Sequence, residues 1–96
     1  MRTEEEVFKD FKKLGYKIDN DENHLIMENM YNNKFIVIGK LLLTIYCYKR
    51  VEKSYETLIN GSKMEMKYYY TAEPNGLLIN EFELLLELFK IWGWLL

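Results

Sequence analysis

Apolar residues near the end of the chain recur at the spacing of one helix face. The residues at positions i, i+3, i+4 and i+7 of this face are Phe82, Leu85, Leu86 and Phe89. Asn80 can cap the amino end of this helix with Glu83 as its capping-box partner, and Gly93 can end it. Because few polar residues lie between these ends, we expect a core helix that is covered on more than one side.

The first residues carry a start signal for another helix. Thr3 and Glu6 have the spacing of a capping box, and Gly15 is suited to a left-handed stop. The sequence therefore predicts a helix over about residues 4–14. Its apolar stripe consists of Val7, Phe8, Phe11 and Leu14.

Between the helices the pattern changes to the alternation and β-branched runs of strands. The predicted strands cover residues 16–18, 24–28, 34–38 and 41–48. Gly39 and Lys40 form either a tight turn or a bulge in one long strand. We favour the turn, because an unbroken strand of about 15 residues exceeds the usual length. Residues 49–54 are then expected to be a charged connection.

A hairpin turn is predicted at Asn60-Gly61, because both residues tolerate the positive φ that a two-residue turn needs. The turn joins residues 55–59 to residues 62–70. Alternation places one set of side chains on the face that we expect to look inward. This set is Met64, Met66, Tyr68 and Tyr70.

The order of these elements predicts an α+β fold. After a turn around Pro74, residues 77–79 can add a short edge strand before the last helix. The chain of 96 residues is too short for two cores, so residues 1–96 are expected to form a single domain. We expect an antiparallel meander of about four to six strands, with the amino-terminal helix and the long apolar carboxy-terminal helix packed on it.

Composition limits the classes of function. The net charge is −2, so no strong field draws the whole chain toward nucleic acid or a cationic partner. The single cysteine, Cys47, excludes an internal disulfide and fits the cytosol. The acidic start, with Glu4 to Glu6, does not resemble a signal peptide, and every apolar run is shorter than the roughly 18 residues of a membrane span. We therefore expect a cytoplasmic protein without a membrane partner.

Catalytic and metal-binding patterns are weak. A zinc site needs several ligands, but His24 and Cys47 are the only imidazole and thiol and lie on different predicted strands. Cys47 lies in an apolar run where an inert buried thiol is expected. Asp19 and Asp21 belong to a polar turn, where such residues bond locally. We expect no enzyme, no cofactor and no metal.

Basic residues lie among tyrosines in the second half of the chain. Basic groups neutralise phosphates and aromatic rings stack on bases, so this combination can bind nucleic acid. The residues concerned are Lys49, Arg50, Lys53 and Lys67. Glu52, Glu56 and Glu65 dilute the patch. A small nucleic-acid-binding or transcription-regulating protein is therefore the alternative function.

Aromatic residues, at 16 %, exceed what a small core needs, although tyrosines also lie half-buried on strands. Tyrosine and tryptophan are preferred anchors of protein interfaces. The tail, residues 91–96, either folds back on the sheet, forms a homodimer seam or docks to a target. We thus expect a non-enzymatic protein-binding module. Its candidate contacts are Tyr48, Arg50, Tyr55, Tyr68, Tyr69, Tyr70 and Trp94.

Two stretches flank a meander rich in Tyr, Lys and Asn. They are Phe11-Lys12-Lys13-Leu14-Gly15-Tyr16 and Glu87-Leu88-Phe89-Lys90-Ile91-Trp92-Gly93-Trp94-Leu95. In this style the chain resembles small orphan proteins of phages and prophages of low-GC Gram-positive bacteria, a class that includes anti-CRISPR proteins. The resemblance implies an inhibitor of a bacterial defence nuclease, such as a CRISPR effector, with a host defence complex as its partner. Since the net charge is only −2, we expect docking through aromatic and mixed-charge surface rather than DNA mimicry.

Overall fold

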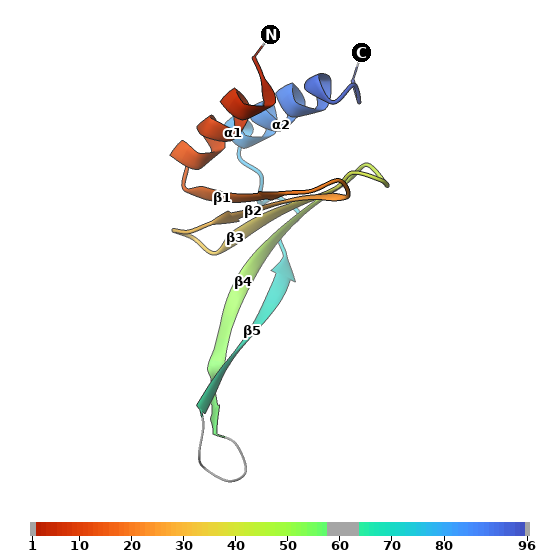
Figure 1. Ribbon diagram of the computed structural model, residues 1–96. Coiled ribbons are helices and arrows are strands. Elements are labelled where there is room, and N and C mark those ends of the chain that lie inside the picture. The colour runs from red at the N-terminus through yellow and green to blue at the C-terminus, as the bar shows by residue number, and fades with distance from the viewer. Residues whose placement is uncertain (1, 58–63, 96) are drawn as a thin grey trace.

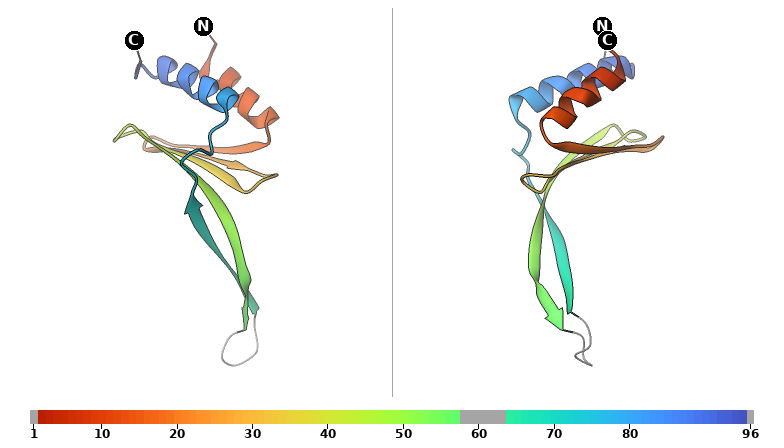
Figure 2. Two further views of the ribbon diagram at one scale, coloured as in Figure 1. Left: turned by 180° about the vertical axis from the view of Figure 1, so that it is seen from behind. Right: turned by 60° about the vertical axis from the view of Figure 1, so that its left-hand side comes forward.

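Two helices lie side by side on one face of a five-stranded antiparallel sheet, as Figures 1 and 2 show. The computed structural model describes the backbone of residues 2–57 and 64–95, and the side chains of residues 2–51 and 70–95. The elements in chain order are α1 (Glu4–Lys13), β1 (Tyr16–Asn20), β2 (His24–Asn29), β3 (Lys34–Gly39), β4 (Thr44–Thr57), β5 (Met64–Ala72) and α2 (Ile79–Ile91). The strands follow one another in the sheet in the order β1-β2-β3-β4-β5. This meander confirms the predicted single α+β domain.

The ends of α1 follow the sequence signals. Thr3 and Glu6 form the predicted capping box, with the Glu6 amide donating to Thr3 Oγ1 over 3.3 Å. The helix ends at Lys13 rather than at residue 14, and Gly15 follows with a φ of +100°. The Gly15 amide donates to the Lys12 carbonyl over 3.0 Å. The left-handed stop is therefore confirmed.

The start of α2 differs from the prediction. The helix begins at Ile79, so residues 77–79 do not form an edge strand. Asn80 and Glu83 do not form the predicted cap; instead Glu81 Oε1 accepts the Leu78 amide over 2.9 Å. A buried carboxylate three residues after the cap residue thus replaces a capping side chain.

The predicted end of α2 is confirmed. Gly93 has a φ of +78°, and its amide donates to the Lys90 carbonyl over 3.1 Å. The Trp94 amide donates to the Phe89 carbonyl over 2.8 Å. These two bonds make a Schellman motif that turns the tail back toward the helix.

One hydrophobic core lies between the helices and the sheet. Its members are Val7, Phe11, Tyr16, Leu25, Met27, Ile36, Ile38, Leu85, Leu88 and Phe89. The prediction that α2 is covered on more than one side is confirmed, because α2 packs against α1 beside it and, through the core, against the sheet below it. The outer side of α2 faces solvent, where Ile79 is 80 % exposed and Phe82 is 47 % exposed.

Strand β4 departs most from the prediction. Residues 41–43, predicted as strand, belong to the turn that begins at Lys40. The predicted charged connection, residues 49–54, lies within β4, which runs unbroken for 14 residues. Its length is possible because β5 pairs with it along the whole hairpin, with a register shift between Glu52 and Tyr55. In Figures 1 and 2 this hairpin extends well beyond the other strands.

Parts of the predicted hairpin lie outside the described residues. These are the turn at Asn60-Gly61 and the side chains of Met64, Met66 and Tyr68. Tyr70 is described and does not look inward as predicted. It pairs with Arg50 and lies on the face of the sheet away from the helices, where it is 57 % exposed.

A buried ion pair joins β3 to α2. Lys34 Nζ lies 2.5 Å from Glu81 Oε1 and donates to the Gly76 carbonyl over 2.9 Å. The Tyr16 hydroxyl of β1 donates to Glu81 Oε2. Burial, strengthened by this bond to a carboxylate, raises the pKa of Tyr16 well above its usual value. Among the described residues, no buried side-chain nitrogen or oxygen lacks a hydrogen-bond partner.

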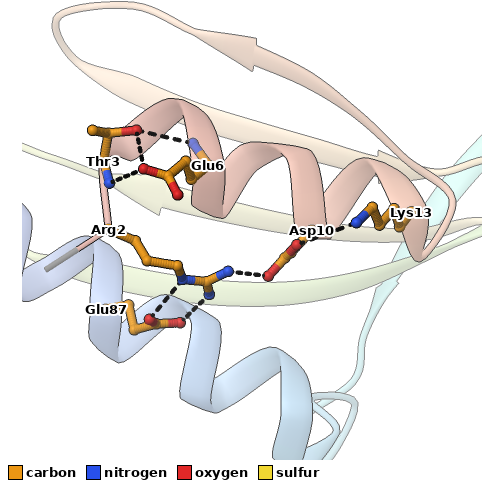
Figure 3. Close-up of polar contacts among 6 residues, drawn as sticks. All are labelled: Arg2, Thr3, Glu6, Asp10, Lys13 and Glu87. Carbon is orange, nitrogen blue, oxygen red and sulfur yellow. Dashed lines mark hydrogen bonds and ion pairs between the residues drawn. The ribbon is translucent and has the colours of Figure 1, made fainter.

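A second ion-pair cluster joins the two helices at the surface, as Figure 3 shows. The Arg2 guanidinium donates to both Glu87 carboxylate oxygens, over 3.1 and 2.6 Å, and also binds Asp10. Its hydrogen bond holds the pKa of Asp10 below its usual value. These side chains are about a third exposed, so solvent screens their attraction.

We expect the buried pair to contribute far more stability than the surface cluster. Glu81→Ala leaves the Lys34 ammonium buried without its counter-ion and should lower the free energy of unfolding by about 3–5 kcal/mol. The double variant Lys34→Met/Glu81→Met should lose less, because no uncompensated charge remains. Arg2→Ala is the control and should have the smallest effect. Urea unfolding monitored by tryptophan fluorescence measures all three, and equal losses for Glu81→Ala and Arg2→Ala would contradict the assignment.

Candidate functional site

The alternation of strand side chains gives the sheet one covered and one open face. In β3, Lys34, Ile36 and Ile38 are buried under the helices, while Phe35 and Val37 point to the other side. Both views in Figure 2 show that neither helix lies on this other side. The sheet therefore presents an uncovered face that begins in its central strand.

Strand pairing brings aromatic side chains together on this face. Tyr48 of β4 pairs with Phe35, and Tyr46 pairs with Val37. The Tyr46 and Tyr48 rings stack with centroids 5.9 Å apart, and the Phe35 and Tyr70 rings meet edge to face at 5.3 Å. The side chains that line this open aromatic face are Ile26, Phe35, Val37, Tyr46, Tyr48 and Tyr70. Because Tyr46 is 50 % exposed and Tyr70 is 57 % exposed, the face offers ring surface to a partner.

The charges beside the open aromatic face balance one another. Lys17 of β1 pairs with Glu28 of β2, and Asp19 pairs with Ile26. Arg50 Nη1 lies 3.3 Å from Glu28 Oε1, and its guanidinium carbon is 5.9 Å from the Phe35 ring centroid. Two positive and two negative side chains sum to zero, so this described part of the face has no net field.

The structure brings three of the predicted contact residues together. Tyr48, Arg50 and Tyr70 all lie on the open face. Trp94 does not, because the turn at Gly93 folds it onto α2. Its ring stacks on Phe89 with centroids 4.9 Å apart, on the helix side of the sheet. The side chains of Tyr55, Tyr68 and Tyr69 lie outside the described residues.

The tail, residues 91–95, packs within the chain. The Trp92 and Trp94 rings lie 5.1 Å apart, both against the core, and Lys40 Nζ lies 4.9 Å from the Trp92 ring centroid. Of the tail side chains described, Leu95 is 39 % exposed. The fold-back that the sequence left open is the arrangement observed.

The basic residues of the alternative function do not converge. Lys49 pairs with Lys34, which places it on the helix side of the sheet, whereas its neighbour Arg50 pairs with Tyr70 and lies on the open side. Arg50 already binds Glu28 and the Asn33 side chain. The side chains of Lys53 and Lys67 lie outside the described residues.

Sequence reasoning missed Ile26, Phe35, Val37 and Tyr46. Their β-branched and aromatic run is typical of a strand buried on both faces, and nothing local in the sequence shows that helices cover only one face. The one charged residue of this strand, Lys34, marks the opposite face, because it is buried on the helix side while its neighbour Phe35 lies on the open face.

Sequence reasoning also missed the turn Lys40–Leu43, which we call the leucine turn. Leu41, Leu42 and Leu43 are 77 %, 81 % and 60 % exposed. An open hollow lined by Leu41, Leu42, Tyr46 and Tyr48 joins this turn to the open aromatic face. The two features therefore form one continuous and mostly apolar surface, with Asn23, His24 and Thr44 as the polar residues of the hollow.

Catalytic groups do not assemble among the described residues. His24 lies at the exposed end of β2 on the open side, whereas Cys47 pairs with the buried Ile36 on the helix side. Asp21 stabilises its own turn by accepting hydrogen bonds from the Asn23 and His24 amides over 2.8 and 2.7 Å. These bonds lower the pKa of its carboxyl group. The described part of the chain contains no group of three or more residues suited to hold a metal ion.

Comparisons of the chain with models of protein families, with curated proteins and with solved structures found no match. Neither described helix is long and apolar enough to cross a membrane. The geometry of the surface therefore carries the functional argument.

We expect Cys47 to react slowly in the native protein. Burial raises the pKa of the Cys47 thiol, so the native protein carries less of the reactive thiolate than the unfolded chain does at the same pH. Gly76 also lies directly beside the sulfur and restricts access to it. At pH 8, iodoacetamide should modify native Cys47 at least about tenfold more slowly than the urea-unfolded chain, as followed by mass spectrometry. Native alkylation as fast as in the unfolded chain would show an activated thiol and reopen the case for catalysis.

Proposed function

We propose that this protein is a non-enzymatic protein-binding module that docks through the open aromatic face. The observation that carries the proposal is a sheet face with exposed tyrosines that no helix covers. Tyr46 and Tyr70 present large rings with few rotatable bonds, so burying them against a partner costs little side-chain entropy. Their stacked and edge-to-face neighbours hold them in place before binding.

The absence of net charge on the described face favours a protein over nucleic acid as the partner. Nucleic-acid affinity comes largely from Lys and Arg that neutralise phosphates. Here Arg50 is paired with Glu28, and Lys49 lies on the opposite side of the sheet. Aromatic rings next to balanced charges suit a protein interface with an apolar centre and a polar rim.

We also propose the biological setting that the resemblance implies. The protein is an anti-defence inhibitor of phage or mobile-element origin that acts in the host cytosol on a bacterial defence nuclease, such as a CRISPR effector. It acts by occupying a surface of that complex. A broad sheet face is suited to this mode of inhibition, because it can cover a large area of the target surface without a catalytic group.

One observation favours the alternative function. A sheet with helices on one face and aromatic rings on the other is also a way to bind single-stranded nucleic acid by stacking. The ring pair Tyr46 and Tyr48 has the exposure that this needs. The expected difference is in salt dependence, because phosphate contacts weaken steeply as salt rises.

Affinity capture from a Gram-positive host lysate treated with nuclease tests the proposal. The wild-type protein should retain a stoichiometric protein partner through a wash at about 0.5 M salt, because an apolar interface is little screened. Tyr46→Ser/Tyr48→Ser should lose at least about tenfold of the captured partner. Tyr31→Ser is the matched control, since Tyr31 is 86 % exposed in the β2–β3 turn, where its ring lies beside Gly15 rather than among the residues of the open face.

A second measurement separates the alternative. Fluorescence anisotropy with oligo-dT and oligo-U of about 20 nucleotides should show no saturable binding at about 150 mM salt. Saturable binding that falls with salt, together with no protein retained in the capture, would replace the proposed function by the nucleic-acid one. Equal capture by wild type and Tyr46→Ser/Tyr48→Ser would remove the open face as the site.

A further inference from the structure

The leucine turn places a leucine where the backbone disfavours it. Leu43 has a φ of +52°, in the left-handed region that glycine and asparagine adopt most easily. Its side chain is 60 % exposed, so no core packing compensates for this conformation. Strain at an exposed apolar residue is a reason to look for a contact outside the chain.

The turn is held firmly by its surroundings. The Lys40 amide donates to the Asn23 carbonyl over 2.8 Å. Lys40 Nζ donates to Asn20 Oδ1 over 2.5 Å and to the Asp21 carbonyl over 2.6 Å, and it lies over the Trp92 ring. The β1–β2 turn and the Trp92 ring at the end of α2 thus hold Lys40, the first residue of the leucine turn, before any partner binds.

The neighbouring β1–β2 turn is acidic. Asp21 and Glu22 are exposed at the same end of the sheet, and Lys40 reaches into this turn through its bonds to Asn20 and Asp21. The hydrogen bonds from the His24 and Asn23 amides lower the pKa of Asp21 below its usual value. The Lys40 ammonium offsets one of the two carboxylates, so Asp21, Glu22 and Lys40 together leave one net negative charge beside the exposed leucines.

We propose that the leucine turn is an anchor that inserts into an apolar pocket of a protein partner whose rim carries Lys or Arg. This inference rests on the proposed function, because the hollow lined by Leu41, Leu42 and Tyr48 makes the turn continuous with the open aromatic face. Charge complementarity selects the occupant. An acidic border attracts a basic rim, whereas it repels a second copy of this chain and an anionic membrane.

A displayed library of random 12-residue peptides, selected on the wild-type protein, tests the chemistry of the partner. Enriched peptides should combine apolar residues with Lys or Arg. Leu41→Ser/Leu42→Ser should weaken their binding at least tenfold, and Glu22→Gln should weaken it less while reducing its salt dependence. Ile79→Ser is the matched control, because Ile79 is 80 % exposed but lies on α2, and it should leave the affinity unchanged.

Leu43→Gly separates a binding role from a structural one. The variant relieves the left-handed strain and should raise the midpoint of thermal unfolding by roughly 4 °C, while it lowers peptide affinity. A variant that is more stable and still binds as tightly as wild type would overturn the role of Leu43.

Other outcomes decide between the proposals. Loss of binding in Tyr46→Ser with none in Leu41→Ser/Leu42→Ser would leave the proposed function standing and overturn the anchor. Binding that is unaffected in both variants, or no enriched peptide at all, would count against both. The anchor would also be overturned by leucine-dependent binding to vesicles of phosphatidylcholine and phosphatidylglycerol, or by a leucine-dependent dimer in sedimentation velocity.

Discussion

Both helices lie on the same face of the five-stranded sheet, and this arrangement determines what the molecule leaves exposed. Neighbouring side chains of a strand point to opposite faces, so each buried position is followed by one that no helix covers. Phe35 and Val37 are uncovered because Lys34, Ile36 and Ile38 are buried. The single helical layer therefore produces the open aromatic face, and the chain fills that face with rings and branched side chains rather than with charges. Exposing a contiguous apolar face to water is unfavourable in free energy, and such faces usually mark interaction sites.

The buried pair of Lys34 and Glu81 explains how α2 reaches its place in this layer. The chain leaves the long β4–β5 hairpin and must turn back over the sheet, and Glu81 is the point where it is held. The Glu81 carboxylate accepts hydrogen bonds from Lys34 of β3, from Tyr16 of β1 and from the Leu78 amide at the start of α2. Two apolar side chains of similar volume could match the contribution of Lys34 and Glu81 to stability, but they would make none of the three hydrogen bonds that Glu81 accepts.

The sequence predicted the elements whose signals are local and missed the features that depend on neighbours distant in the chain. The capping box at Thr3 and the stop at Gly93 are local, because the residues that satisfy the backbone lie within one turn. The start of α2 is not, since Lys34 lies 47 residues away from the carboxylate that replaces the cap. For the candidate site, Tyr48, Arg50 and Tyr70 were predicted from residue type, whereas Phe35 and the leucine turn were not. Exposure is a property of the assembled layer, and a run of apolar residues does not reveal it.

The leucine turn and the acidic β1–β2 turn are best understood together. Exposed leucines next to an aromatic face would also favour association of the chain with itself, because apolar surfaces do not distinguish between partners. Asp21 and Glu22 change this, since two copies that bring their leucine turns together also bring their carboxylates together. Like charges at a contact cost free energy, while a basic partner gains from the same groups. In the proposed complex, the apolar residues would supply affinity and the acidic residues would supply selectivity. The strained backbone at Leu43 adds to this argument, because Leu43 is 60 % exposed and is not among the described residues that pack on the core.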